Sequence, residues 1–157
     1  SHAADRLIQN MDALVEALRA SVQRVPTRIQ VVDFAKLSLV EQVLTARQTH
    51  VLVGMHGAGL TNLLLLPWQG AAVVELFPVK APSYHWFRGL ARLRGGLTYL
   101  RWTPPMPSPT AQPATASVTG GTGTLVPPAE FVAIVHAALA AAEGGVASLG
   151  VYNAVLG

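Results

Sequence analysis

Two short and almost wholly apolar runs, 51–53 and 71–77, dominate the pattern of hydrophobic and polar positions along the chain. Neither run alternates with polar residues, so both are predicted to be strands buried on both faces of a mainly parallel sheet. The first run breaks at Gly54 and passes through a glycine-rich turn, after which 60–66 is compatible with a short helix. A strand, a glycine-rich turn and a helix in this order are typical of a site that presents backbone N–H groups to an anion, most often a phosphate.

The other elements follow from helical or strand periodicity. Asp5 is a plausible N-cap, and Ser38 with Glu41 three residues later predicts a capping box. The predicted helices are 5–20, 39–48, 83–93 and a C-terminal helix within 129–144, and the further predicted strands are 28–34 and 97–102. Helices that alternate with apolar strands predict an α/β fold, here a single Rossmann-like three-layer domain over 1–157.

Two segments carry no periodic pattern. Residues 103–128 are rich in Pro, Thr, Ser, Ala and Gly, a composition that cannot offset the entropy of ordering by burial, so a flexible loop is predicted there. The tail from Val146 onward is apolar but shows no clear period, and no element is predicted for it.

Composition narrows the classes of function. The chain has 157 residues, which is enough for one domain. Of these residues, 51% are hydrophobic and only 12% are charged. No apolar run reaches the length of a membrane span, so no transmembrane segment is expected in this chain. The net charge of +3 is scattered, and nucleic acid is not expected as a partner. The absence of cysteine excludes disulfides and thiolate chemistry, and the five histidines lack the spacing of metal ligands, so no metal site is expected.

Two groups of residues are candidates for chemistry, because ligands of open α/β sheets bind beyond the carboxyl ends of the strands. The first is the turn from His56 to Asn62, and the second is Glu75, near the end of the following strand. Glu75 could accept hydrogen bonds from a ribose diol, or it could be held by a fixed partner in the protein; an unpaired buried carboxylate would be costly. Thr61 and Asn62 could cap the short helix or contact phosphate.

Commoner interpretations of the turn are excluded by what the sequence lacks. Gly54, Gly57 and Gly59 give G-x-x-G-x-G, which is not the dinucleotide fingerprint, and neither a P-loop nor a G-x-S-x-G nucleophile elbow occurs. Further along the chain, aromatic residues are expected in the core and three arginines are expected on a solvated helix face. The aromatic residues are Tyr84, Trp86, Phe87 and Tyr99, and the arginines are Arg88, Arg92 and Arg94.

The stretch SLVEQVLTARQTHVLVGMHGAGLTNLLLLPWQGAAVVELFP, residues 38–78, resembles the signature of glycosyltransferase family 61. This family includes plant xylosyl- and arabinosyltransferases and animal enzymes that add GlcNAc to O-mannose or directly to Ser/Thr. The resemblance extends over about 6–99, and Arg6 with Asn10 weakly matches the family's Arg–x–x–x–Asn segment.

The resemblance implies that the chain is the C-terminal, donor-binding half of a GT-B glycosyltransferase that uses a UDP-sugar. It implies that the turn faces the diphosphate, that Glu75 lies near the ribose or uridine, and that Arg6 belongs to the donor site. The turn residues so implied are His56, Gly57, Ala58, Gly59, Leu60, Thr61 and Asn62. His56 is the catalytic candidate, expected to contact the diphosphate rather than act as general base.

The resemblance also implies what this chain lacks. Family members invert the anomeric centre with a general base that activates an acceptor hydroxyl of a glycoprotein or polysaccharide. That base is expected in the N-terminal domain, most of which is absent here, or at the cleft. No cofactor is obligatory, because GT-B enzymes neutralise the leaving diphosphate with basic side chains and helix dipoles. The chain, expected to be a piece of a longer protein, should bind UDP but transfer little sugar by itself.

The same resemblance predicts the compartment in which the protein acts. A eukaryotic member would be membrane-anchored and act in the Golgi or ER lumen, and a bacterial member would be cytoplasmic. Two alternatives stay open: a GT-B enzyme that uses another nucleotide-sugar, and a non-catalytic nucleotide-binding or protein-association domain.

Overall fold

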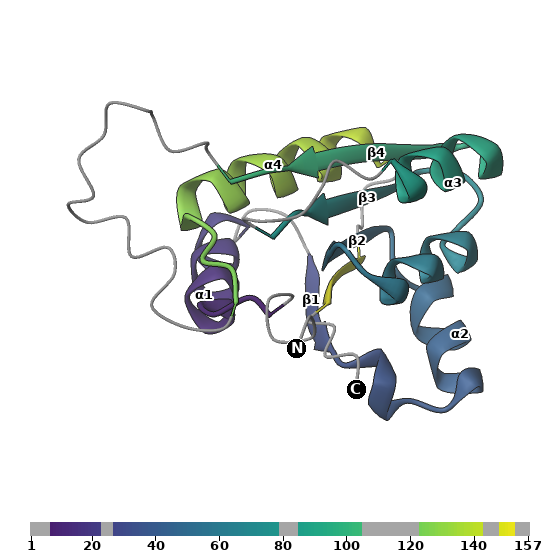
Figure 1. Cartoon of the computed structure of the whole chain (residues 1–157), viewed down its shortest axis with the longest axis horizontal. Helices are drawn as coiled ribbons and strands as arrows, with labels where there is room; N and C mark the ends of the chain where they lie inside the picture. The colour runs from purple at the N-terminus through teal and green to yellow at the C-terminus, as the bar shows by residue number, and fades with distance from the viewer. Residues whose placement is uncertain (1–6, 23–26, 79–84, 105–122, 143–147, 153–157) are drawn as a thin grey trace.

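The computed structural model describes residues 7–22, 27–78, 85–104, 123–142 and 148–152. Within these ranges the chain forms a five-stranded sheet in the order β1-β5-β2-β3-β4, in which all neighbouring strands are parallel (Figure 1). The strands are β1 (Arg28–Val32), β2 (Val51–Met55), β3 (Ala71–Leu76), β4 (Leu97–Trp102) and β5 (Ser148–Tyr152). The α/β class and the parallel sheet are confirmed, and the arrangement is consistent with a Rossmann-like fold.

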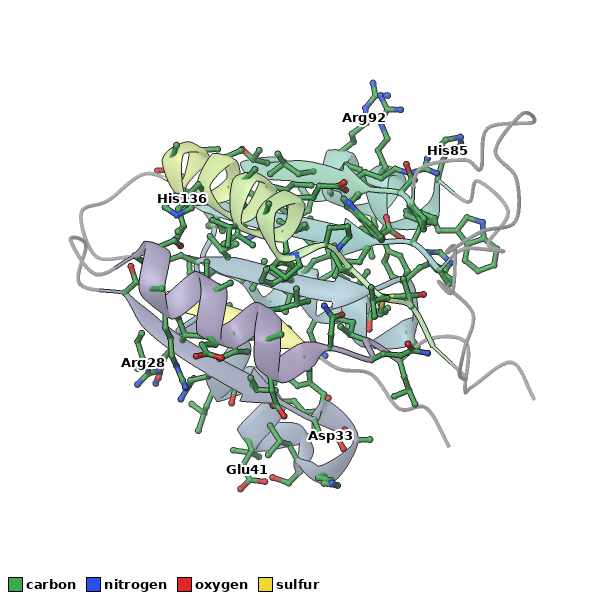
Figure 2. The ribbon with its side chains drawn as sticks, turned by 90° about the vertical axis from the view of Figure 1, so that its left-hand side faces the viewer. Arg28, Asp33, Glu41, His85, Arg92 and His136 are labelled. Atoms are coloured by element: carbon green, nitrogen blue, oxygen red, sulfur yellow. The ribbon has the colours of Figure 1, made fainter. Side chains whose placement is uncertain are left out.

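Helices cover both faces of the sheet. Helices α1 and α4 lie side by side on one face (Figure 2), while α3 and η3 pack on the other face with α2 beside η3. The helices are α1 (Met11–Ser21), η2 (Phe34–Lys36), α2 (Leu39–Arg47), η3 (Ala58–Leu65), α3 (Trp86–Arg94) and α4 (Pro128–Ala141), where η denotes a 3-10 helix.

Alternation along β3 divides its side chains between the two helical layers. Ala72, Val74 and Leu76 pack into the core formed with α1 and α4, whereas Val73 packs with η3 and α3. Glu75 follows Val73 in this alternation, so it points to the η3 and α3 side of the sheet. All six residues of β3 are buried, which explains why the strand lacks the polar alternation of a half-exposed sheet.

Strand β5 is the largest difference from the sequence-based prediction, which assigned no element to the tail. Ser148–Tyr152 lies between β1 and β2 and pairs with both in parallel. The pairing explains why local periodicity missed it, because both partner strands come from the first 55 residues of the chain. A five-residue segment that contains a glycine gives little strand signal of its own.

The segment before α1 is a turn anchored by a β-bridge rather than part of the helix, which corrects two predictions. The helix begins at Met11 rather than at Asp5, which lies outside the described residues. Ile8 instead forms a parallel bridge with Thr124, and the Asn10 side chain donates to Val126 O at 2.8 Å and accepts from Val126 N at 3.1 Å. The last residues of the predicted loop 103–128 are therefore fixed against this segment, while 105–122 lie outside the described residues.

Most other boundaries agree with the sequence. The capping box of α2 is confirmed, with Ser38 and Glu41 bonding each other's backbone N–H groups. The predicted strand 28–34 ends two residues early, because the Asp33 side chain accepts from Ala35 N at 3.1 Å and starts η2 at Phe34. The C-terminal helix spans Pro128–Ala141, with proline in its first turn.

Gly89 occupies an unusual place in the interior of α3. Glycine at such a position costs about 1 kcal/mol of helix stability relative to alanine. The backbone there does not have a positive φ, and a Cβ atom built on Gly89 would meet nothing within 4 Å. Neither backbone conformation nor packing among the described residues therefore requires glycine at this position.

Candidate functional site

The predicted glycine turn lies at the carboxyl end of β2. His56 follows the strand and its backbone N–H donates to Leu76 O at 2.7 Å, which extends the pairing with β3. Gly57 precedes η3, whose first residue is Ala58. Thr61 Oγ1 donates to Ala58 O at 2.6 Å and Asn62 Nδ2 donates to Gly59 O at 3.1 Å, so both side chains tie down the first turn of this helix. The turn is thus fixed by its own side chains.

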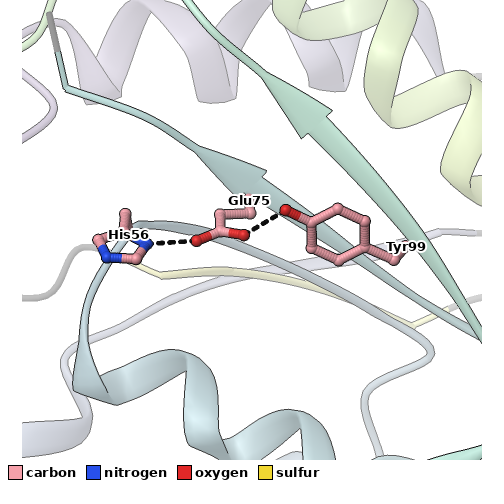
Figure 3. Close-up of polar contacts among 3 residues, drawn as sticks. All are labelled: His56, Glu75 and Tyr99. Atoms are coloured by element: carbon pink, nitrogen blue, oxygen red, sulfur yellow. Dashed lines mark hydrogen bonds and ion pairs between the residues drawn. The ribbon is translucent and has the colours of Figure 1, made fainter. Parts of the chain in front are cut away.

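His56, Glu75 and Tyr99 form one connected chain of hydrogen bonds (Figure 3). The carboxylate of Glu75 accepts through Oε1 from His56 Nδ1 and through Oε2 from the Tyr99 hydroxyl. Nδ1 carries the proton of the hydrogen bond to Glu75. The second ring nitrogen, Nε2, lies on the side of the ring that is turned away from the carboxylate (Figure 3). The residues come from three neighbouring positions of the sheet: the end of β2, β3 and β4.

Burial and ring contacts hold this cluster in place. Glu75 has 0% exposed surface, and the His56 side chain has 11%. The His56 ring stacks on Phe77, with centroids 5.0 Å apart, and meets the edge of Phe87 at 5.4 Å. A buried carboxylate with both oxygens paired is a fixed acceptor, so of the two alternatives that the sequence left open for Glu75, the structure shows the fixed protein partner.

Tyr99 is held as a hydrogen-bond donor. Burial raises the pKa of its hydroxyl well above the ordinary value, and the hydrogen bond to Glu75 raises it further, while the charges of Arg101 and Arg88 act in the opposite direction. The phenol therefore keeps its proton at neutral pH and donates a hydrogen bond to the carboxylate. Arg101 is the register partner of Glu75 on β4, and its guanidinium lies over the Phe77 ring, 4.1 Å from the centroid.

We expect Tyr99→Phe to change how stability depends on alkaline pH. The unfolded chain loses the Tyr99 proton near pH 10.0, whereas the folded chain retains it. The stabilisation from this hydroxyl is therefore complete below pH 10 and declines as pH rises further towards the raised pKa of the folded state. Urea midpoints of both proteins, measured below and above pH 10, should converge with rising pH. Parallel pH curves would contradict the assignment of Tyr99 as a buried donor.

A cavity of about 620 Å³ opens beside His56, between η3 and α3. One wall is the glycine turn, which contributes His56, Gly57, Ala58 and Thr61, and the other wall is α3 with His85 before it. We call this cavity the η3–α3 groove. A second hollow of about 460 Å³ lies on the other side of η3, towards η2 and α2. The turn is therefore accessible on both of its flanks.

The burial predicted for the aromatic and arginine residues of α3 is confirmed at some positions and wrong at others. Phe87 is buried as predicted, but Trp86 is 73% exposed rather than in the core, because it lies on the groove side of α3. Arg88 and Arg92 are exposed as predicted, and Figure 2 shows Arg92 projecting away from the sheet. The prediction for Arg94 is wrong, because this side chain is buried, with only 8% of its surface exposed.

Arg94 donates to backbone carbonyls instead of facing solvent. Its Nη2 donates to Leu66 O at 2.7 Å and to Pro67 O at 2.5 Å, and its Nη1 donates to Gly95 O at 3.2 Å. The guanidinium also lies 5.4 Å from the ring centroid of Trp68. This side chain fastens the end of α3 to the segment that follows η3.

The sequence did not single out two residues of the site, Tyr99 of the cluster and Arg101 beside it on β4. A usable signal exists: alternation along 97–102 puts Tyr99 and Arg101 on one face, and parallel pairing puts that face beside Glu75. Two residues named from the sequence, Arg6 and Tyr84, lie outside the described residues.

Among the residues that the structure describes, no group of three or more His, Asp or Glu side chains is arranged to hold a metal ion. No helix in these parts of the chain combines the length and apolar character required to span a bilayer.

Comparison with known proteins points to one family. Residues 1–74 match the family model of Glycosyltransferase 61. The EGF domain-specific O-linked N-acetylglucosamine transferase of Xenopus laevis is 43% identical over 100 residues, which cover 62% of this chain and 18% of that protein. The protein of the same name from Drosophila melanogaster is 39% identical over 97 residues, or 62% of this chain and 17% of that protein.

A second kind of enzyme is similar over a slightly longer stretch. The protein O-linked-mannose beta-1,4-N-acetylglucosaminyltransferase 2 of Bos taurus is 39% identical over 113 residues, which cover 70% of this chain and 19% of that protein. The chain thus spans about a fifth of the length of the curated relatives that it matches: 18%, 17% and 19% of the three proteins named here.

Proposed function

Since this chain belongs to the glycosyltransferase 61 family, we propose that it is the donor-binding part of a glycosyltransferase that uses a UDP-sugar. On this proposal it belongs to the C-terminal half of a GT-B enzyme that transfers the sugar, with inversion, to a hydroxyl of a protein or polysaccharide. The relatives named above are N-acetylglucosaminyltransferases by name, which supports transfer of a sugar to a protein. The observation that carries the proposal is the fixed turn from His56 to Asn62 beside the Glu75 carboxylate.

The diphosphate is assigned to the glycine turn. The first turn of η3 presents backbone N–H groups and the positive end of a helix dipole at the carboxyl edge of the sheet. Thr61 and Asn62 bond carbonyls within this turn, so they hold its N–H groups in position rather than compete for the anion. Gly57 and Gly59 are buried, and they keep the backbone bare where the phosphate would approach.

His56 is assigned to the leaving diphosphate. Its Nδ1 is held by Glu75, which orients the ring so that Nε2 is turned away from the carboxylate. A positioned polar group at this place can contact the negative charge that develops when the glycosidic bond to the diphosphate breaks. Glu75 thus acts on the donor through His56, and Tyr99 holds Glu75 in turn, which makes both of them positioning residues.

The remaining parts of the reaction are assigned to the rest of the enzyme. We place the general base and the acceptor site in the N-terminal domain, so this chain alone should bind UDP and transfer little or no sugar. A eukaryotic protein of this kind would work in the Golgi or ER lumen and a bacterial one in the cytoplasm.

We expect this chain to bind UDP, and His56→Ala to weaken that binding by about tenfold or more, the value of one hydrogen bond to a charged group. Calorimetric titration with UDP measures the change, and titrations with ADP and GDP test the choice of nucleotide. His136→Ala is the matched control, because His136 is an exposed histidine of α4 on the other face of the sheet (Figure 2). It should leave UDP affinity unchanged.

Two results would contradict the proposal. One is the absence of nucleotide binding by the wild-type chain. The other is equal UDP affinity in the wild type and in a folded His56→Ala variant, which would favour a domain kept for protein association.

A further inference from the structure

The carboxyl end of β3 presents two side chains that are each contacted from both neighbouring strands. β2 and β4 flank β3 in the sheet. The first side chain, Glu75, meets His56 at the end of β2 and Tyr99 of β4 (Figure 3). The second, Phe77, meets the same His56 ring, with centroids 5.0 Å apart and planes inclined by 24°, and the guanidinium of Arg101 on β4, 4.1 Å from its centroid. The imidazole is therefore held twice, at Nδ1 by Glu75 and on its face by Phe77.

Arg101 is placed unfavourably for stability alone. The side chain is half-buried, and its Nε is a buried donor without a hydrogen-bond partner among the described residues. Its register partner Glu75 cannot take that role, because both carboxylate oxygens already accept hydrogen bonds from His56 and Tyr99. The guanidinium instead lies over the Phe77 ring in a cation–π contact. A buried donor left unpaired lowers stability, and such departures are expected where a side chain serves a site.

The two restraints on His56 fix different things. A hydrogen bond at Nδ1 fixes one atom of the imidazole and tolerates some tilt of the ring plane, because hydrogen bonds accept a range of angles. A stacked ring restrains the plane itself, and its strength depends on the offset and angle of the two rings. The direction of the free edge of the imidazole, where Nε2 lies, therefore depends on Phe77 as well as on Glu75. Whatever holds Phe77 in place also acts on that direction.

We propose that Arg101 is a positioning residue for the His56 imidazole and acts through Phe77, whose ring it holds against the imidazole face. The inference rests on the proposed function, which gives His56 its contact with the leaving diphosphate. Arg101 itself does not touch the donor. Without the guanidinium, Phe77 shifts and the imidazole plane tilts, so that Nε2 no longer points at the diphosphate and the donor binds less tightly. A direct contact between the guanidinium and the phosphates would give a different pattern in the variants below.

Proton NMR of the His56 ring in the ligand-free chain measures the restraint directly, because its carbon-bound protons lie in the ring current of Phe77. Arg101→Met keeps the aliphatic stem and removes the guanidinium, so these signals should move towards those of an unstacked histidine. Arg101→Lys keeps a cation for the ring and should restore part of the wild-type shift. Arg88→Met is the matched control, because Arg88 is exposed on α3 and its charge acts on the pKa of the Tyr99 hydroxyl in the same direction as that of Arg101. It should leave the His56 signals unchanged.

A double-mutant cycle on UDP affinity tests the route from Arg101 to His56. Arg101→Met should weaken UDP binding by about threefold or more in the wild-type background, the scale of a cation–π contact. It should have no further effect in Phe77→Leu, where the guanidinium has no ring to hold. An equal loss in both backgrounds would show a direct contact with the ligand and would overturn the inference.

Wild-type His56 signals or wild-type UDP affinity in Arg101→Met would also overturn it, even if Phe77→Leu does not fold. In each of these cases the proposed function stands as long as His56→Ala loses affinity for UDP. If the wild-type chain does not bind UDP, the proposed function fails. The His56 signals of the ligand-free variants then decide by themselves whether Arg101 positions the ring.

Discussion

Replacing Glu75 with alanine is expected to lower the free energy of unfolding by about 3 kcal/mol or more, because two buried donors lose their acceptor and a cavity remains. The carboxylate is completely buried, at 0% exposure, and accepts from both His56 Nδ1 and the Tyr99 hydroxyl. Water has little access to take its place. Urea unfolding of wild type and variant, followed by circular dichroism, measures the difference.

Glu75→Gln is the matched control, since it keeps the volume of the side chain. One amide oxygen can still accept, while the amide NH₂ turns the second contact into a donation that His56 or Tyr99 must accept. We therefore expect a smaller loss of stability and a change in the proton position on the His56 ring, visible in its ¹⁵N chemical shifts. A loss below about 1 kcal/mol for Glu75→Ala would show that the carboxylate does not hold this cluster together.

Arg94→Met should lower the free energy of unfolding by about 2–4 kcal/mol, because hydrogen bonds from a charged donor are among the stronger ones in proteins. The guanidinium donates to the carbonyls of Leu66, Pro67 and Gly95, and methionine preserves only the aliphatic part of the side chain. The same unfolding measurement tests this prediction.

Arg94→Lys separates charge from geometry. An ammonium group keeps the positive charge but lacks the fork that reaches two adjacent carbonyls, so it should recover only part of the lost stability. Arg92→Met, at an exposed position of the same helix, should have an effect within about 0.5 kcal/mol. Equal stabilities of Arg94→Met and Arg92→Met would contradict the role of Arg94 as a fastening between α3 and η3.

The strands that carry the site could be predicted because their whole environment is apolar. Every residue of β2 and β3 is buried, so the sequence shows two uninterrupted hydrophobic runs. The glycine turn could be placed because the first of these runs ends at it. The capping box of α2 could be read directly, since Ser38 and Glu41 interact over three residues. Each of these signals is local.

What the sequence did not show depends on contacts between distant segments. Tyr99 and Glu75 meet only because β3 and β4 pair in one register. Arg94, the last residue of α3, is buried because its side chain lies over the Trp68 ring. Helical periodicity alone instead groups Arg94 with the exposed Arg88 and Arg92. Trp86 was assigned to the core because apolar spacing does not distinguish a helix face that packs on the sheet from one that lines a groove.

The position of β5 has a consequence for the order in which the molecule can assemble during synthesis. β1 and β2 do not pair with each other; each is hydrogen-bonded to Ser148–Tyr152. Among the described strands, β1 therefore has no partner until the ribosome has made residues 148–152, which follow every other described element. Such long-range closure slows folding, and the nascent chain meanwhile exposes unpaired strand edges. A chain of this topology should rely on chaperones until β5 is in place.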